Sequence, residues 1–209
     1  MSAENLTIVD HPLIRTRLAV IRQASTETAA FREALHDVAR LMTFEVTRDL
    51  ETKPLEVETP ITKMQADELK RPIIFVPILR AGIGLQNGFS DIVSESHVGY
   101  IGLFRDEETL QPKKYYCKLP DNITDGDVFL IDPMLATGGS AIEAASQLKE
   151  AGATRIRFVC LIAAPEGVAE FHKAHPDVPI FTAALDECLN EKSYIVPGLG
   201  DAGDRYFGT

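Results

Sequence analysis

The chain has 209 residues, of which 45% are hydrophobic and 25% are charged, and its formal net charge is −10. This length and apolar content are sufficient for one compact domain with a substantial core. The negative charge argues against a general affinity for nucleic acid, because such affinity requires lysine and arginine to neutralise phosphates. A small anionic substrate needs only a few local donors, so the composition does not exclude one.

Apolar segments and cysteines indicate the compartment. The longest wholly apolar stretches, such as residues 159–164, are far shorter than the roughly 20 residues that span a bilayer. The N-terminal segment MSAENLTIVD has no apolar signal core. Cys117, Cys160 and Cys188 lie too far apart for a typical structural zinc site or disulfide framework. We therefore expect a soluble, cytoplasmic protein with reduced thiols and no membrane contact.

The first predicted element is a long amphipathic helix over residues 26–50. Its apolar positions recur every three or four residues, at Phe31, Leu35, Val38, Met42 and Val46. This spacing places them on one face of a helix, with charged residues between them. Ser25 or Thr26 is the predicted N-cap.

Five short apolar runs follow the helix, alternating with helical patterns. The runs are IIFVP (73–77), VGYIGLF (98–104), VFLID (128–132), IRFVCLIAA (156–164) and PIFTAAL (179–185), and the helical patterns cover about 82–93, 138–151 and 165–175. Continuous rather than alternating apolarity predicts strands that are buried on both faces. The alternation with helices predicts an α/β fold with a parallel sheet. We expect one domain over 1–209 with its core at about 70–185.

The segment VFLIDPMLATGGS, residues 128–140, predicts a phosphate and ribose site. A buried strand ends at Asp132, and Gly138 and Gly139 precede a helix whose free N–H groups favour an anion. Thr137 and Ser140 add hydroxyl donors, and Asp132 can accept hydrogen bonds from ribose hydroxyls. An ordinary helix cap is the alternative on the short motif alone. A Walker-type loop is disfavoured because no Gly-Lys-Ser/Thr follows.

Two further segments contain arginines near predicted strand ends. VPILRAGIG, residues 76–84, places Arg80 before two glycines and a helix start, where it can bind a phosphate oxygen. The polar excursion FRDEETLQPKKYYCKLP, residues 104–120, begins with Arg105. Taken alone, these features are also typical of a solvated arginine and a solvated hairpin.

The C-terminal segment YIVPGLGDAGDRYFGT, residues 194–209, is rich in glycine yet contains aromatic and apolar residues. Its proline and glycines predict an exposed but shaped backbone rather than a helix or a disordered tail. Small residues such as Gly200 and Ala202 would let the backbone approach a ligand. A glycine-rich acidic turn is the alternative, although EF-hand spacing is absent.

These segments resemble the type I phosphoribosyltransferases, and DPMLATGGS is similar to the uracil-specific branch. Many members have two adjacent acidic residues where this chain has Asp132 and Pro133. That difference favours uracil over adenine, hypoxanthine or orotate. The resemblance implies a central, mostly parallel sheet flanked by helices, a β-hairpin arm that is mobile at about 104–120, and a C-terminal hood that binds the base at about 194–209.

The resemblance also implies the reaction and the residues that perform it. The 5-phosphoribosyl group of 5-phosphoribosyl 1-pyrophosphate (PRPP) would pass to N1 of uracil, giving UMP and pyrophosphate. The implied catalytic residues are Asp132, Arg105 and Asp201. The implied PRPP contacts are Arg80, Arg105, Asp132, Pro133, Met134, Leu135, Ala136, Thr137, Gly138, Gly139, Ser140 and Asp201. The implied uracil contacts are Ile195, Gly200, Asp201 and Ala202.

Further expectations concern the cofactor and partners. Magnesium is expected to arrive with PRPP, near Asp201, without an assigned protein ligand. The resemblance implies at least a homodimer, and it leaves open whether GTP acts as an effector, as it does in some uracil enzymes. A regulator with the same fold, or an enzyme for another base, is the alternative. The chain has no lysine or arginine run for nucleic acid, and YIVPGLGDA lacks the extra cation that the carboxylate of orotate would favour.

Overall fold

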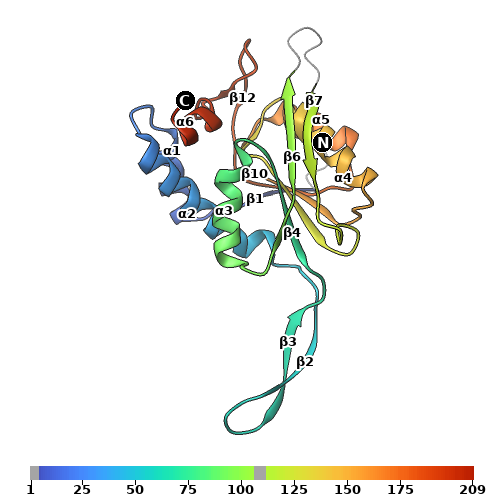
Figure 1. Ribbon diagram of the computed structural model, residues 1–209. Helices are drawn as coiled ribbons and strands as arrows, with labels where there is room; N and C mark the ends of the chain where they lie inside the picture. Colours follow the sequence, from blue (N-terminus) through green and yellow to red (C-terminus); the bar gives the residue numbers. More distant parts are fainter. Residues whose placement is uncertain (1–4, 106–111) are drawn as a thin grey trace.

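The computed structural model describes residues 5–105 and 112–209, apart from the side chains of Arg105 and Pro112. Its centre is a nine-stranded sheet with the main order β1-β11-β10-β8-β4-β6-β7 (Figure 1). The strands are β1 Leu6–Ile8, β4 Ile73–Leu79, β5 His97–Val98, β6 Tyr100–Arg105, β7 Pro112–Lys118, β8 Asp127–Ile131, β9 Met134–Leu135, β10 Ile156–Ala163 and β11 Ile180–Leu185. Only β7 among these described strands is antiparallel to its neighbour. The predicted mostly parallel sheet is therefore confirmed.

Helices cover both faces of this sheet, as Figure 1 shows. One layer contains α1 (Pro12–Arg22), α2 (Thr28–Val46) and α3 (Gly82–Ile92), and the other contains α4 (Gly139–Glu150) and α5 (Pro165–Ala174). The short C-terminal helix α6 (Ala202–Phe207) packs against α2. In the described part of the chain, no helix is both long and apolar enough to cross a membrane. The cytoplasmic location stays a prediction.

Alternating residues of the central strands enter two separate cores. In β4, Phe75 belongs to the core beneath α1, α2 and α3, whereas Ile74 and Val76 belong to the core beneath α4 and α5. The ring of Phe75 lies 5.6 Å from that of Phe129 and 5.7 Å from that of Phe89. Burial on both faces explains why the sequence of β4 is continuously apolar. The first core also includes α1 and α2, beyond the expected range of about 70–185.

The predicted amphipathic helix is α2, and its apolar stripe is buried as expected. The predicted cap is wrong, because the N-cap is Glu27, which makes no side-chain capping bond in the described structure. Thr26 instead donates its hydroxyl to the carbonyl oxygen of Val20, at 2.6 Å. That bond ties the start of α2 to α1 and leaves the hydroxyl unavailable as a cap.

A hairpin of β2 (Thr52–Glu58) and β3 (Lys63–Leu69) projects far from the sheet (Figure 1). It was not predicted from the sequence. Most residues on both of its strands are exposed, so the sequence lacks the apolar alternation that marks a half-buried strand. We call this hairpin, residues 52–69, the arm; it is a different hairpin from the one expected at about 104–120.

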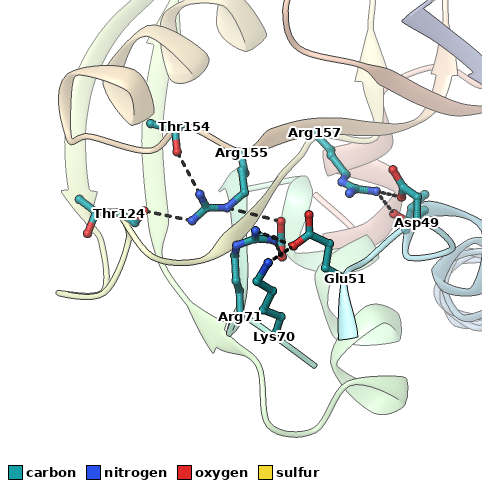
Figure 2. A network of polar contacts seen from close by, with 10 residues as sticks. Asp49, Glu51, Lys70, Arg71, Thr124, Thr154, Arg155 and Arg157 are labelled. Carbon is teal, nitrogen blue, oxygen red and sulfur yellow. Dashed lines mark hydrogen bonds and ion pairs between the residues drawn. The ribbon is translucent and has the colours of Figure 1, made fainter. Parts of the chain in front are cut away.

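An ion-pair network holds the base of the arm at the amino-terminal edge of the sheet, and Figure 2 shows most of its members. Glu51 accepts from Lys70 at 2.7 Å and from Arg71 at 2.8 Å, so the two ends of the arm are joined. Arg71 and Arg155 approach the two oxygens of Asp127 at 3.9 and 3.7 Å. The network thereby links the arm to the first residue of β8.

Candidate active site

A cavity of about 260 Å³ lies where the loop after β8 meets the C-terminal segment. Its walls come from three parts of the chain that are distant in sequence. The lining residues are Ala81, Asp132, Met134, Ala136, Ser193, Tyr194, Ile195, Gly200, Asp201, Ala202 and Gly203. Carboxyl ends of parallel strands are the usual ligand-binding edge of an open α/β sheet. The predicted ribose segment, at residues 128–140, and the predicted base segment, at residues 194–209, therefore meet at this cavity.

Asp132 follows β8 directly and lies in this cavity. Burial raises the pKa of its carboxyl to about 7, and the nearby negative charge of Asp201 also raises it. The N–H of Met134 donates to Oδ1 of Asp132 at 3.4 Å, which acts in the opposite direction. In the free protein near neutral pH, the carboxyl is therefore divided between its charged and neutral forms.

The loop between Asp132 and α4 has a supporting half and an exposed half. Pro133 accepts the N–H groups of Leu161 and Ile162 through its carbonyl, and Leu135 is 1% exposed. These two predicted PRPP contacts support the loop from within the core. Thr137 and Ser140, at the start of α4, are exposed.

The start of α4 is suited to an anion. Its N-cap is Gly138, with φ of 85°, and no side chain of the described residues caps the helix. A Cβ on Gly139 would meet nothing nearer than Oγ1 of Thr137, at 3.9 Å. The packing of the protein does not require glycine at 139, whereas a closely approaching phosphate would. The geometry thus provides uncapped N–H groups beside open space.

Arg80 follows β4, after a cis peptide bond with Leu79. Its side chain is 58% exposed and lies 3.7 Å from Oδ1 of Asp204. Its guanidinium also lies 5.2 Å from the ring centre of Phe207. Exposed ion pairs of this kind are weak, so the side chain is free to exchange this partner for a phosphate oxygen. Arg80 does not line the described cavity, although its neighbour Ala81 does.

Arg105, the remaining predicted pyrophosphate contact, is the last residue of β6. Its side chain is outside the described structure, as are residues 106–111 of the predicted hairpin. The described part of that hairpin consists of β6 and β7, which pair from Tyr100 with Lys118 to Arg105 with Pro112.

The C-terminal segment encloses the cavity opposite Asp132. Ile195 lies in β13 (Ile195–Val196), which pairs with β12 (Cys188–Leu189), and it is 4% exposed. Gly200 has φ of 82°. Asp201 is the N-cap of α6 and accepts the N–H of Asp204 at 2.9 Å. The expectation of a backbone without helix was wrong here, because the capping carboxylate of Asp201 allows residues 202–207 to form α6.

Four cavity residues were not predicted from the sequence: Ala81, Ser193, Tyr194 and Gly203. Ala81, Tyr194 and Gly203 are each adjacent in sequence to a predicted contact, so the prediction found the segment but not the individual residue. Ser193 differs, because it has φ of 63° in a turn whose ends are closed by Asn190. The Asn190 side chain, which accepts the N–H of Tyr194, was the available sequence signal for that turn.

Comparisons with known proteins bear on this geometry. A sequence model of the family described as uracil phosphoribosyltransferase matches residues 8–209. The chain is also 56% identical over 203 residues to a uracil phosphoribosyltransferase from Staphylococcus aureus, with 97% of each chain covered. The chain belongs to the uracil phosphoribosyltransferase family. This membership confirms the resemblance drawn from the sequence segments.

Solved structures agree with the family. The AQ2163 protein from Aquifex aeolicus superposes with a TM-score of 0.92 at 36% identity, with 98% of both chains covered. A purine phosphoribosyltransferase from Pyrococcus horikoshii gives a TM-score of 0.52 at 17% identity, covering 73% of this chain and 83% of its own. The latter likeness shows only the shared type I phosphoribosyltransferase fold, which differs in detail between the uracil family and the purine enzyme.

Proposed function

We propose that this uracil phosphoribosyltransferase transfers the 5-phosphoribosyl group of PRPP to N1 of uracil, producing UMP and pyrophosphate in pyrimidine salvage. The observation that supports this most strongly is that Asp132, Gly200, Asp201 and Ala202 line the same cavity. A ribose held beside Asp132 would present its anomeric carbon toward the C-terminal segment. Family membership supports the substrate class, and the shared lining of the cavity by the proposed ribose segment and the proposed base segment supports binding of the two reacting groups side by side.

We assign the binding roles by the chemistry of each group. The uncapped N–H groups at the start of α4 bind the 5-phosphate, with Thr137 and Ser140 as hydroxyl donors. Asp132 accepts hydrogen bonds from the ribose hydroxyls. Arg80 and Arg105 stabilise the pyrophosphate as negative charge develops on it.

Uracil recognition falls to backbone groups of the C-terminal segment. Besides the reacting N1, uracil has two carbonyl acceptors and the N3–H donor, and the backbones of Ile195, Gly200 and Ala202, which line the cavity, have donors and acceptors to match them. Cytosine would place a donor opposite a donor, which leaves buried groups unpaired. Specificity for uracil thus needs no charged side chain.

The reaction then depends on orientation. The bond from the anomeric carbon to pyrophosphate breaks, the bond from that carbon to N1 forms, and the N1 proton leaves. No protein nucleophile is assigned, because the charge that develops is stabilised by hydrogen bonds and cations. A closed hairpin over the site would keep water from the electrophilic sugar carbon.

The two carboxylates in the cavity are suitable ligands for magnesium carried by PRPP. Magnesium is usually held by one or two carboxylates and by substrate phosphates, and Asp132 and Asp201 both line the cavity. When bound, the ion would neutralise charge on the pyrophosphate leaving group. The two aspartates would orient the substrate to which it is attached.

The assay of this function compares uracil, cytosine, orotate and hypoxanthine with PRPP and magnesium, and it measures nucleotide and pyrophosphate. We expect UMP from uracil and little product from the other bases. Absence of UMP would refute the proposal, and preference for another base would refute the assignment of uracil. Addition of GTP to the same assay tests whether it is an effector, which requires a faster rate or a lower KM.

We also propose that two copies associate through the arm. The arm exposes Ile61 at 92%, Met64 at 49% and Leu55 at 38%, while it touches little of its own domain (Figure 1). Such a hairpin is stable when its apolar residues are covered, and a second copy offers the same surface in return. Sedimentation velocity should show a dimer for the wild type and dissociation for Ile61→Asp. A monomeric wild type would refute the proposal.

A further inference from the structure

The loop that precedes Gly200 is attached to a charged pair outside the cavity. Arg22 is the last residue of α1, and Asp186 follows β11. Their side chains are 24% and 4% exposed, and Arg22 donates to both oxygens of Asp186 at 2.5 and 2.7 Å. Neither residue lines the described cavity. This two-bond geometry fixes the orientation of both side chains.

Both members of the pair also bind the backbone of Gly198. Its N–H donates to Oδ2 of Asp186 at 2.9 Å, and its carbonyl accepts from Arg22 at 2.8 Å. Gly198 has φ of 65°, and a Cβ there would lie 2.1 Å from the carbonyl oxygen of Ile195. The tightest point of the loop is therefore held on both of its polar groups, two residues before Gly200.

A second arginine holds the next carbonyl. Arg205 donates to Leu199 at 2.8 Å and to Gln23 at 2.7 Å, and it also donates to the carbonyl of Ile21. Its guanidinium lies 4.6 Å from the ring centre of Phe31, and burial lowers its pKa. The carbonyls at 198 and 199 are thus both held by guanidinium groups beside the C-terminal end of α1.

We propose that Arg22 and Asp186 are positioning residues that fix the orientation of the backbone presented to uracil. This inference rests on the proposed base contacts at Gly200 to Ala202. With the two preceding carbonyls bound at α1, the backbone enters the cavity at Gly200 in one orientation. Without the Arg22–Asp186 pair the loop samples other orientations, and fixing one of them on binding weakens the affinity for uracil. The start of α4, where PRPP phosphate would bind, makes none of these contacts.

The test separates the two substrates. Arg22→Lys keeps the charge but cannot make the paired bonds, and Asp186→Asn keeps the shape while removing the charge. We expect each to raise the KM for uracil about tenfold, the effect of losing one buried charged hydrogen bond. The dissociation constant of PRPP, measured by calorimetry without uracil, should change less than about twofold.

A matched control comes from the opposite edge of the sheet. Arg157 pairs with Asp49 in the network of Figure 2, and its side chain is 14% exposed. Arg157→Lys should lower the melting temperature without changing either substrate constant. If Arg22→Lys and Asp186→Asn behave like this control, or weaken PRPP as much as uracil, the positioning role is refuted. UMP formation by the wild type, measured in parallel, tests the proposed function independently.

Discussion

Replacement of Asp132 by asparagine should make the protein more stable and less able to bind PRPP. Burial raises the pKa of Asp132 from 3.8 to about 7, so the folded protein binds this proton more tightly than the unfolded chain does. Stability therefore falls as the pH rises from about 4 to about 7, and the full cost remains above that range. A pKa difference of this size corresponds to about 4 kcal/mol.

Asparagine removes the charge but keeps an oxygen that can accept the N–H of Met134. The variant should exceed the wild type in free energy of unfolding by up to about 4 kcal/mol near pH 8.5, and by close to zero near pH 4. Urea unfolding at fixed protein concentration, followed at five or six pH values, measures this difference. Asp121→Asn, which removes an exposed carboxyl, is the matched control.

If the free energies of unfolding of Asp132→Asn and the wild type differ by the same amount over this pH range, the reasoning is refuted. The same variant should bind PRPP more weakly, because an amide accepts hydrogen bonds from ribose less strongly than a carboxylate. Stability gained while affinity is lost is the expected signature of a binding residue. Unchanged PRPP affinity would refute the role of Asp132 at the ribose.

Gly139→Ala should leave the melting temperature unchanged or slightly higher, yet raise the KM for PRPP about tenfold, because its Cβ would occupy space that a phosphate needs. Ellman's reagent at about pH 8 should modify two thiols in the native chain, the exposed Cys117 and Cys188, and a third only after denaturation, since burial raises the pKa of Cys160 to about 12. Asp127→Ala should cost about 2 kcal/mol in urea unfolding by leaving Arg155 without its carboxylate and Arg71 with Glu51 alone, while KM values stay constant.

The sequence predicted the central sheet because its signal is local. Runs such as β4 and β10 are apolar at successive positions, and the two cores explain that pattern. The arm could not be predicted in the same way. Its strands pair only with each other and expose most side chains, so neither periodicity nor apolar content distinguishes them from a polar loop.

The site divides along the same line. Asp132, Gly139 and Gly200 could be proposed as contacts from the sequence, because each belongs to a short motif with a strand end, a glycine or a helix start. Arg22 and Asp186 could not, since they lie 164 positions apart and share no motif. Only the meeting of α1 with the end of β11 makes them a pair. Candidate ligand contacts can be proposed from motifs, whereas a charged pair such as Arg22 and Asp186 becomes visible only in the tertiary packing.

The two ends of β8 show how the fold separates stability from binding. Asp127 begins the strand between Arg71 and Arg155, which supply its counter-charge. Asp132 follows the strand, and the groups that act on its pKa besides burial are the N–H of Met134 and a second carboxylate, Asp201. A substrate that brings positive charge, as magnesium on pyrophosphate would, lowers the pKa of Asp132 and is favoured by its ionisation. Under the proposed binding mode, the unbalanced charge at the carboxyl end is a cost in the free protein that a magnesium-bound substrate would offset.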